Sequence, residues 1–155
     1  MRTNIIITFI LASLLGLSSA AFAQSDVAVV VNEKNSSNNV TLGELRKIFS
    51  GEKHNWGSGT PIRLFVREPG AQERTLVLTL LGMSESEYKQ YWTKQVYRGE
   101  AVSEPVVLFS NGMQKEAITT YPGAVALVRI QDVKPGMKVL KVGGYAPGDA
   151  QYPLK

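Results

Sequence analysis

Apolar residues in this chain form two kinds of pattern, which alternate along the sequence and predict strands separated by helices. Continuous runs rich in β-branched residues are typical of strands buried on both faces of a sheet. Such runs occupy 26–32, 62–67, 105–109, 124–129 and 138–142. Between them, apolar residues recur at helical spacing over 41–50, 71–81, 85–98 and 110–120. This alternation predicts an α/β fold, a three-layer α/β/α domain with a mostly parallel or mixed sheet.

Capping residues define the expected helix ends more closely. Thr41 with Glu44, and Ser84 with Glu87, have the spacing of capping boxes, in which each side chain bonds the other residue's backbone N–H. Gly82 suits the left-handed position that follows a helix. The helical side chains that we expect to face the core are Leu42, Leu45, Ile48, Phe49, Leu76, Val77, Leu80, Leu81, Tyr88, Tyr91, Trp92, Val96, Met113, Ala117 and Ile118.

Two irregular segments carry further expectations. The loop at 52–61 contains Trp56, which we expect to cover the core, and His54, which we expect to be solvated. The tail from Gly143 is rich in glycine and proline, and we predict that it is poorly ordered.

The N-terminus has the features of a secretory signal peptide. Arg2 precedes an apolar stretch from Ile5 to Leu17, and small residues at 21 and 23 suit a signal peptidase. We therefore predict a signal peptide at 1–23, one mature domain at 24–155, and a periplasmic location. The apolar run is short for a permanent anchor, so no membrane span is expected after cleavage.

Composition excludes several function classes. The chain has no cysteine, which excludes disulfides, thiolate metal sites and cysteine nucleophiles. Its formal net charge of +4 is mild and the charges are interspersed, so no nucleic-acid partner is expected. No recognisable catalytic motif or metal-ligand cluster is present, so we predict a protein that is not an enzyme, without catalytic residues, bound metal or cofactor.

The segment that follows the second predicted strand has the chemistry of an anion site. The strand delivers Arg67 and Gly70 to the start of a helix, where backbone N–H groups and the helix dipole favour an anion. The candidate ligand-binding residues are Arg67, Gly70, Ala71, Gln72 and Ser110, the last because it begins another helix. Two alternatives stay open: Arg67 pairs with Glu68 or Glu73, and Ser110 only caps its helix.

Several motifs together resemble the phosphate-binding proteins of ABC transporters. They are VAVVVN at 27–32, TLGELRKIFSG at 41–51, Trp56 beside a Gly-rich loop, IRLFVR at 62–67 and YPGAVALV at 121–128. The resemblance implies the type 2 periplasmic binding-protein fold with a ligand cleft at strand ends. It also implies a secreted solute-binding protein for phosphate or a related small anion, with an ABC transporter permease or another periplasmic protein as partner.

Two departures from that family's pattern bear on function. The match begins near Val27, which leaves no room for the glycine- and serine-rich phosphate loop that precedes this part in full-length relatives. The second phosphate loop of the family reads Arg, two residues, then Gly-Ser-Gly-Thr. Here Ala71 replaces the serine, and Gln72 and Glu73 replace the Gly-Thr pair. An alternative function is therefore an interaction or accessory module that kept the scaffold and lost the ligand.

Overall fold

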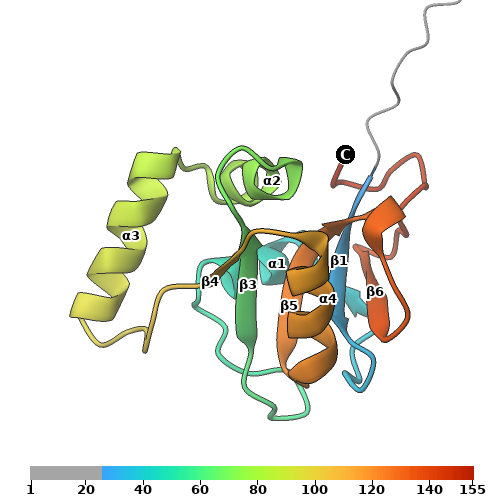
Figure 1. Ribbon diagram of the computed structural model, residues 1–155, viewed down its shortest axis with the longest axis horizontal. Coiled ribbons are helices and arrows are strands. Elements are labelled where there is room, and N and C mark those ends of the chain that lie inside the picture. Colours follow the sequence, from blue (N-terminus) through green and yellow to red (C-terminus); the bar gives the residue numbers. More distant parts are fainter. Residues whose placement is uncertain (1–25) are drawn as a thin grey trace, which may run out of the picture.

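A computed structural model describes residues 26–155; the predicted signal peptide lies outside the described residues. The chain forms a six-stranded mixed sheet in the order β2-β6-β1-β5-β3-β4, flanked by helices (Figure 1). In chain order the elements are β1 (Val27–Asn32), β2 (Asn39–Val40), α1 (Leu42–Phe49), β3 (Arg63–Arg67), α2 (Gln72–Leu81), α3 (Glu85–Tyr97), β4 (Val106–Leu108), α4 (Asn111–Thr120), β5 (Ala124–Arg129), the 3₁₀ turn η1 (Ile130–Asp132) and β6 (Met137–Val142).

The sheet buries β1 at its centre. β1 is antiparallel to both β5 and β6, whereas β3 runs parallel to both of its neighbours, β5 and β4. Val27, Val29 and Val31 of β1 pack in one apolar cluster with residues of α1, α2 and α3, while Ala28 and Val30 pack in another with residues of α4. The predicted three-layer α/β architecture with a mixed sheet is confirmed.

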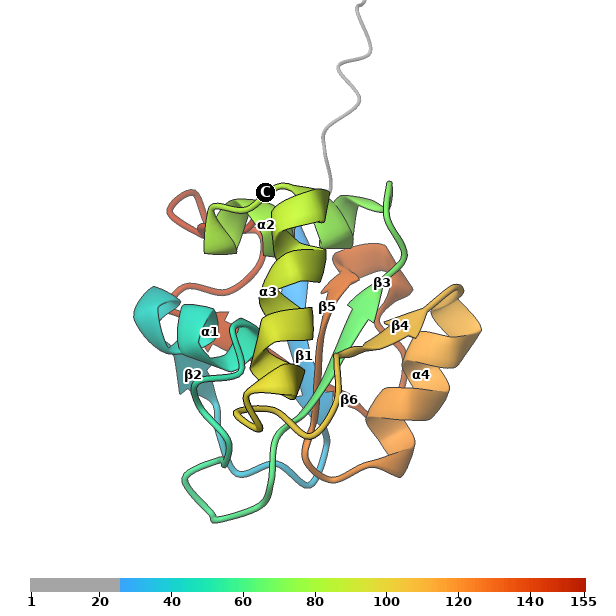
Figure 2. The ribbon, with the colours of Figure 1, turned by 90° about the vertical axis from the view of Figure 1, so that its left-hand side faces the viewer.

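Helix α3 stands at the end of the molecule beside β3 and β4, away from the rest of the sheet (Figure 1). Viewed from that end, it lies in front of the sheet (Figure 2). Tyr88 and Trp92 attach it to the body and are 4% exposed each, as expected for core residues, whereas Tyr91 is only half-buried. Val96 is 37% exposed, so its expected place with these core residues is wrong. Both predicted capping boxes are present, at the starts of α1 and α3.

The buried face of α4 differs from the prediction. Met113 is 40% exposed, so its assignment to the core is wrong, whereas Ala117 and Ile118 are buried as expected. Gln114 takes the inward position, and its amide donates to the backbone oxygen of Leu127 at 3.0 Å. A polar side chain is tolerated there because its hydrogen bond replaces the one it loses to water.

The prediction of a poorly ordered tail is also wrong. Tyr152 and Leu154 are 2% and 4% exposed and belong to the core cluster on the α1 side of the sheet. The Tyr152 hydroxyl donates to the backbone oxygen of Val27 at 2.7 Å, and the Val27 N–H donates to the backbone oxygen of Leu154 at 3.0 Å. Two apolar side chains and two hydrogen bonds to β1 therefore hold the tail in place.

The loop between α1 and β3 closes one end of the sheet. Trp56 is 3% exposed, which confirms its expected place over the core, and its indole donates to the backbone oxygen of Gly123 at 3.1 Å. His54 is exposed, as expected. Among residues 26–155, no helix has the length and apolar character needed to cross a membrane.

Candidate anion-binding site

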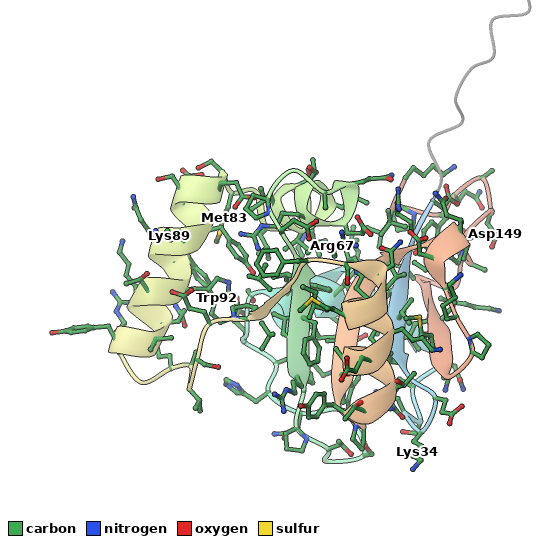
Figure 3. All side chains as sticks on the ribbon, viewed as in Figure 1. Lys34, Arg67, Met83, Lys89, Trp92 and Asp149 are labelled. Atoms are coloured by element: carbon green, nitrogen blue, oxygen red, sulfur yellow. The ribbon has the colours of Figure 1, made fainter. Side chains whose placement is uncertain are left out.

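The candidate site lies where the carboxyl ends of β3 and β4 meet. Arg67 is in register with Leu108, and the Glu68 N–H donates to the backbone oxygen of Leu108 at 3.2 Å. Helix α2 follows β3 and helix α4 follows β4, so the two helix N-termini approach the same sheet end. Figure 3 shows Arg67 at this end of β3. The arrangement brings a guanidinium group to two N-termini that favour negative charge.

Arg67 is already engaged by the protein's own side chains. Its Nε and Nη2 donate to the two carboxylate oxygens of Glu68, each at 2.8 Å, in a bidentate pair. Its Nη1 donates to Oδ1 of Asn111 at 2.7 Å and, at 3.5 Å, to Oε1 of Gln114. The Arg67 side chain is only 12% exposed. The pairing with Glu68 that sequence left open is therefore present.

The pair affects the ionisation of both partners. Hydrogen bonding to Arg67 lowers the pKa of Glu68 to about 2, so this carboxylate stays charged at neutral pH. Hydrogen bonding to Glu68 in turn raises the pKa of Arg67, and burial acts in the opposite direction. An incoming oxyanion meets a carboxylate that already occupies the planar fork of the guanidinium group.

A second carboxylate lies beneath this pair. Glu73 is 3% exposed, and its Oε1 has no hydrogen-bond partner among the described residues. That oxygen is 4.0 Å from Nη1 of Arg67 and 3.9 Å from Nε of Arg129, which also pairs with Asp132 at 2.8 Å. Glu73 is in the first turn of α2, where the helix dipole stabilises its charge. The site thus contains three carboxylates and two guanidinium groups.

The remaining predicted residues shape the backbone around Arg67. Gly70 has φ of +93°, a left-handed conformation that glycine adopts most readily, and it turns the chain into α2. Ala71 is the N-cap of α2 and Gln72 is the helix's first residue. Ser110 caps α4, where its Oγ accepts from the Met113 N–H at 3.1 Å. Its hydroxyl therefore serves the helix end, as the capping alternative expected.

Sequence reasoning missed Asn111 and Gln114 as partners of Arg67, and Arg129 as a neighbour of Glu73. Asn111 and Gln114 lie 44 and 47 residues from Arg67 in the chain, and only the parallel pairing of β3 with β4 brings them close. The sequence did contain one indication of this arrangement, because Gln114 lies on the face of its helix that was expected to be apolar. Within the described part of the chain, no group of three or more acidic or histidine side chains is placed to hold a metal ion.

Restoring a hydroxyl at the N-cap of α2 should stabilise the protein. Ala71 has the extended backbone of an N-cap, with φ of −70° and ψ of 146°, but a methyl group cannot accept a hydrogen bond. Ala71→Ser supplies a hydroxyl oxygen that can accept from the backbone N–H of Glu73 or Arg74 in the first turn, and we expect a gain of about 1 kcal/mol in the free energy of unfolding. Urea unfolding measures the gain. Ala71→Val, which has no oxygen, is the control, and an equal gain there contradicts the capping explanation.

Comparison with known proteins agrees with this fold. The PBP superfamily domain matches residues 16–152 of the chain. Among solved structures, a protein from Clostridium perfringens assigned as a phosphate ABC transporter substrate-binding protein, with bound phosphate, superposes with a TM-score of 0.67 at 17% identity. That alignment covers 84% of this chain and 52% of the other. An ABC-type phosphate transport receptor from Vibrio cholerae gives a TM-score of 0.63 at 24% identity, covering 79% of this chain and 48% of the receptor.

These matches define the class of protein as one with the PBP-like α/β fold. The chain belongs to the family of the PBP superfamily domain, a family similar to phosphate-binding proteins. It spans about half the length of each of the two solved structures described above. At these identities the structural likeness establishes the fold, and the ligand has to be argued from this chain's own residues.

Proposed function

We propose that this chain is a secreted periplasmic solute-binding domain that binds phosphate or a related small oxyanion at Arg67. The observation that carries the proposal is the position of Arg67 between the N-termini of α2 and α4. The anion would accept from the Arg67 guanidinium group beside the N-terminus of α2, whose dipole favours negative charge; the Ala71 N–H already donates to the backbone oxygen of Glu68 at 3.3 Å. Family membership supports the solute-binding role, and an ABC transporter permease is the partner that this role implies.

Binding at this site is expected to be weak because Glu68 competes for Arg67. The anion has to displace the Glu68 carboxylate from the bidentate pair, and the buried charge of Glu73 lies close behind. Like charge beside an oxyanion lowers its affinity. Ala71 offers no hydroxyl in compensation. We therefore expect millimolar rather than tight binding of phosphate by the unaltered protein.

Removing the competing charge should strengthen phosphate binding, and removing Arg67 should abolish it. In Glu68→Gln the side chain keeps its size and loses its charge, so we expect phosphate affinity to rise about tenfold. In Arg67→Ala the rise in melting temperature caused by millimolar phosphate should disappear. Calorimetric titration of residues 24–155 with phosphate, at constant ionic strength, measures the affinity, and thermal unfolding with and without phosphate measures the change in melting temperature.

Arg63→Ala is the matched control for Arg67→Ala. Arg63 begins the same strand, and its guanidinium group stacks over Tyr121 with its central carbon 3.7 Å from the ring centroid. It carries the same charge at the other end of β3, so its loss should leave phosphate binding unchanged. If Glu68→Gln binds no oxyanion, whether phosphate, sulfate or a phosphonate, the proposal is wrong.

The second candidate function is an interaction or accessory module without a small ligand. The observation that favours it is that Glu68 and Asn111 already use the donors of Arg67, so the site is satisfied without an anion. In that case no oxyanion changes the melting temperature of any variant. Cross-linking to a permease or another periplasmic protein should then survive Arg67→Ala.

A further inference from the structure

A cavity of about 520 Å³ lies between α3, the start of α2, and strands β3 and β4, apart from the anion site. Much of its wall is apolar and consists of Val66, Pro69, Pro105 and Val107. Its other wall contains Arg74, Tyr88 and Trp92, whose side chains all carry hydrogen-bond donors. Figure 3 shows Trp92 between α3 and the sheet.

Each of these three residues has one unpaired donor, and each donor atom is buried beneath the cavity surface. These donors are Nη1 of Arg74, the hydroxyl of Tyr88 and Nε1 of Trp92, and none has a hydrogen-bond partner within residues 26–155. The three residues are 6%, 4% and 4% exposed, so water does not reach these atoms freely. Buried donors are almost always paired in native proteins, because an unpaired one loses its bonds to water without replacement. Three together, without an acceptor, indicate that an acceptor is missing.

Packing holds the three donors in place. Nε and Nη2 of Arg74 donate to the two carboxylate oxygens of Glu85 at 3.0 and 2.8 Å, and its guanidinium carbon lies 4.1 Å from the centroid of the Tyr88 ring. The Trp92 ring meets the Tyr88 ring edge-on, with centroids 6.2 Å apart. On its other side Trp92 packs against Gly51, where an added Cβ would come within 2.6 Å of the indole.

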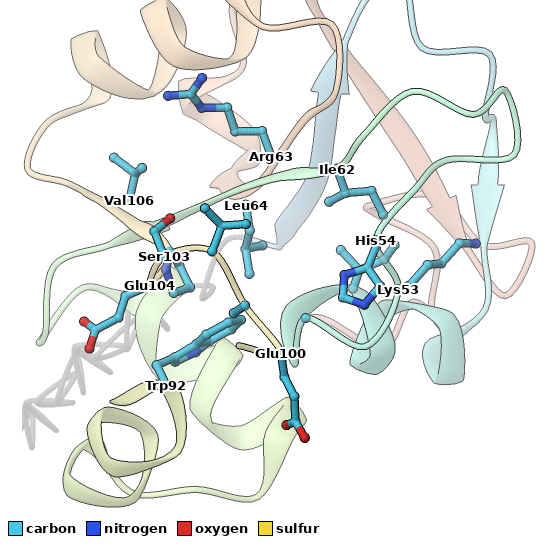
Figure 4. A pocket seen from close by; sticks show the side chains of 15 residues that line it. Lys53, His54, Ile62, Arg63, Leu64, Trp92, Glu100, Ser103, Glu104 and Val106 are labelled. Atoms are coloured by element: carbon cyan, nitrogen blue, oxygen red, sulfur yellow. The ribbon is translucent and has the colours of Figure 1, made fainter. Parts of the chain in front are cut away.

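The indole of Trp92 also forms part of a neighbouring cavity of about 360 Å³, whose wall includes Lys53 and His54 (Figure 4). Trp92 therefore lines two cavities, and its contacts with Tyr88 and Gly51 set the position of its N–H.

The charges around the larger cavity are balanced. Arg74 and Lys89 face Glu85 and Glu104, so the wall as a whole is not cationic. Glu104, the other carboxylate in the wall, accepts from the Thr93 hydroxyl at 3.5 Å. Burial raises the pKa of Tyr88 to about 12.

We propose that this cavity binds a small molecule that has a carboxylate on a compact apolar body. The two carboxylate oxygens offer about four lone pairs, enough for the three unpaired donors, and the apolar body fits the valine and proline wall. Because the donors are buried, entry requires a small outward shift of α3. Gly82 and Gly99 flank this helix, both at positive φ of +65° and +72°, and are the positions where the backbone can turn.

The two tryptophans of the chain make the test direct, because each gives one indole N–H signal in a ¹H–¹⁵N correlation spectrum. The Trp56 indole is bonded to Gly123, whereas the Trp92 indole is unpaired. Titration with cyclohexanecarboxylate, which has no ring current, should move the Trp92 signal downfield and leave the Trp56 signal in place. Cyclohexylmethylammonium, of similar size but without an acceptor, should leave both signals unchanged.

Two conservative variants separate binding from folding. Tyr88→Phe removes only an unpaired buried hydroxyl, so we expect a melting temperature that is unchanged or higher, and about tenfold weaker binding of cyclohexanecarboxylate. Tyr91→Phe is the matched control: its hydroxyl donates to the backbone oxygen of Ser50 at 2.6 Å, outside the cavity wall. It should lower the melting temperature and leave binding unchanged. Arg67→Ala should also leave the binding of cyclohexanecarboxylate unchanged, which separates this site from the anion site.

Three results would overturn the proposal. One is a Trp92 signal that does not respond to cyclohexanecarboxylate at millimolar concentration. Another is equal binding of the carboxylate and the ammonium probe, since the cavity would then not recognise an acceptor. The third is a large shift of the Trp92 signal in Glu104→Gln without any ligand, which would mean that Glu104 already supplies the missing acceptor in solution.

Discussion

Gly123→Ala is expected to destabilise the protein by about 3 kcal/mol or more. A Cβ added at this position lies 1.8 Å from the backbone oxygen of Pro61 and 3.0 Å from its carbonyl carbon, so the two backbone segments have to separate. Separation is costly because the Gly123 oxygen accepts from both the Trp56 indole at 3.1 Å and the Arg63 N–H at 2.9 Å. The expected loss combines steric overlap with weakened buried hydrogen bonds. Urea unfolding followed by tryptophan fluorescence measures it.

Gly112→Ala is the control for this prediction. Gly112 is in the first turn of α4, and the nearest atom to its added Cβ is the Ser110 Oγ at an ordinary contact distance of 3.7 Å. Alanine is the better helix former, so stability should stay the same or rise by up to about 1 kcal/mol. Similar values for the two variants would show that the loop at 52–61 moves freely away from Gly123.

The second large effect is expected in the tail. Tyr152→Ala and Leu154→Ala should each lower the free energy of unfolding by about 3 kcal/mol, because each leaves a cavity in the core cluster. Tyr152→Phe should cost about 1 kcal/mol, since the backbone oxygen of Val27 loses its bond from the hydroxyl. Chemical unfolding of the three variants, with unaltered protein as reference, separates the packing contribution from the hydrogen bond.

Tyr145→Ala is the control within the same tail, because this side chain is 38% exposed. It should change stability by less than about 1 kcal/mol. Equal losses in Tyr145→Ala and Tyr152→Ala would contradict the packed tail. Burial also raises the pKa of Tyr152 above its ordinary value. The stability that it contributes is therefore complete below about pH 10 and declines as the pH rises toward the folded-state pKa, and Tyr152→Phe should lose this decline.

The elements that were predicted correctly from the sequence depend on interactions between residues close together in the chain. Thr41 bonds Glu44 and Ser84 bonds Glu87, within one turn each, and these signals place the starts of α1 and α3 correctly. The end of α2 is equally local, because Gly82 has the left-handed conformation that a C-cap requires. Continuous β-branched runs likewise predict β1 and β5, since both strands are covered on both faces.

The failures concern contacts between segments far apart in the chain. The glycine- and proline-rich tail was expected to be poorly ordered, yet its Tyr152 bonds Val27, 125 residues away. Met113 was placed in the core by helical spacing alone, but the inward position belongs to Gln114, whose amide finds a backbone oxygen in β5. Composition and periodicity do not report which distant backbone atoms are available as partners.

The candidate anion site shows the same division. The sequence of this chain determines that an arginine and a glycine lie between a strand and a helix, because strand pattern, turn residues and helix start are all local. The pairing of Arg67 with its neighbour Glu68 was an alternative that sequence raised and left open, whereas only the tertiary structure brings Asn111 to Arg67, from the start of the helix that follows the next parallel strand. The physical reason is range: caps and periodicity act within a few residues, whereas side-chain pairing depends on strand register and on which groups burial brings together.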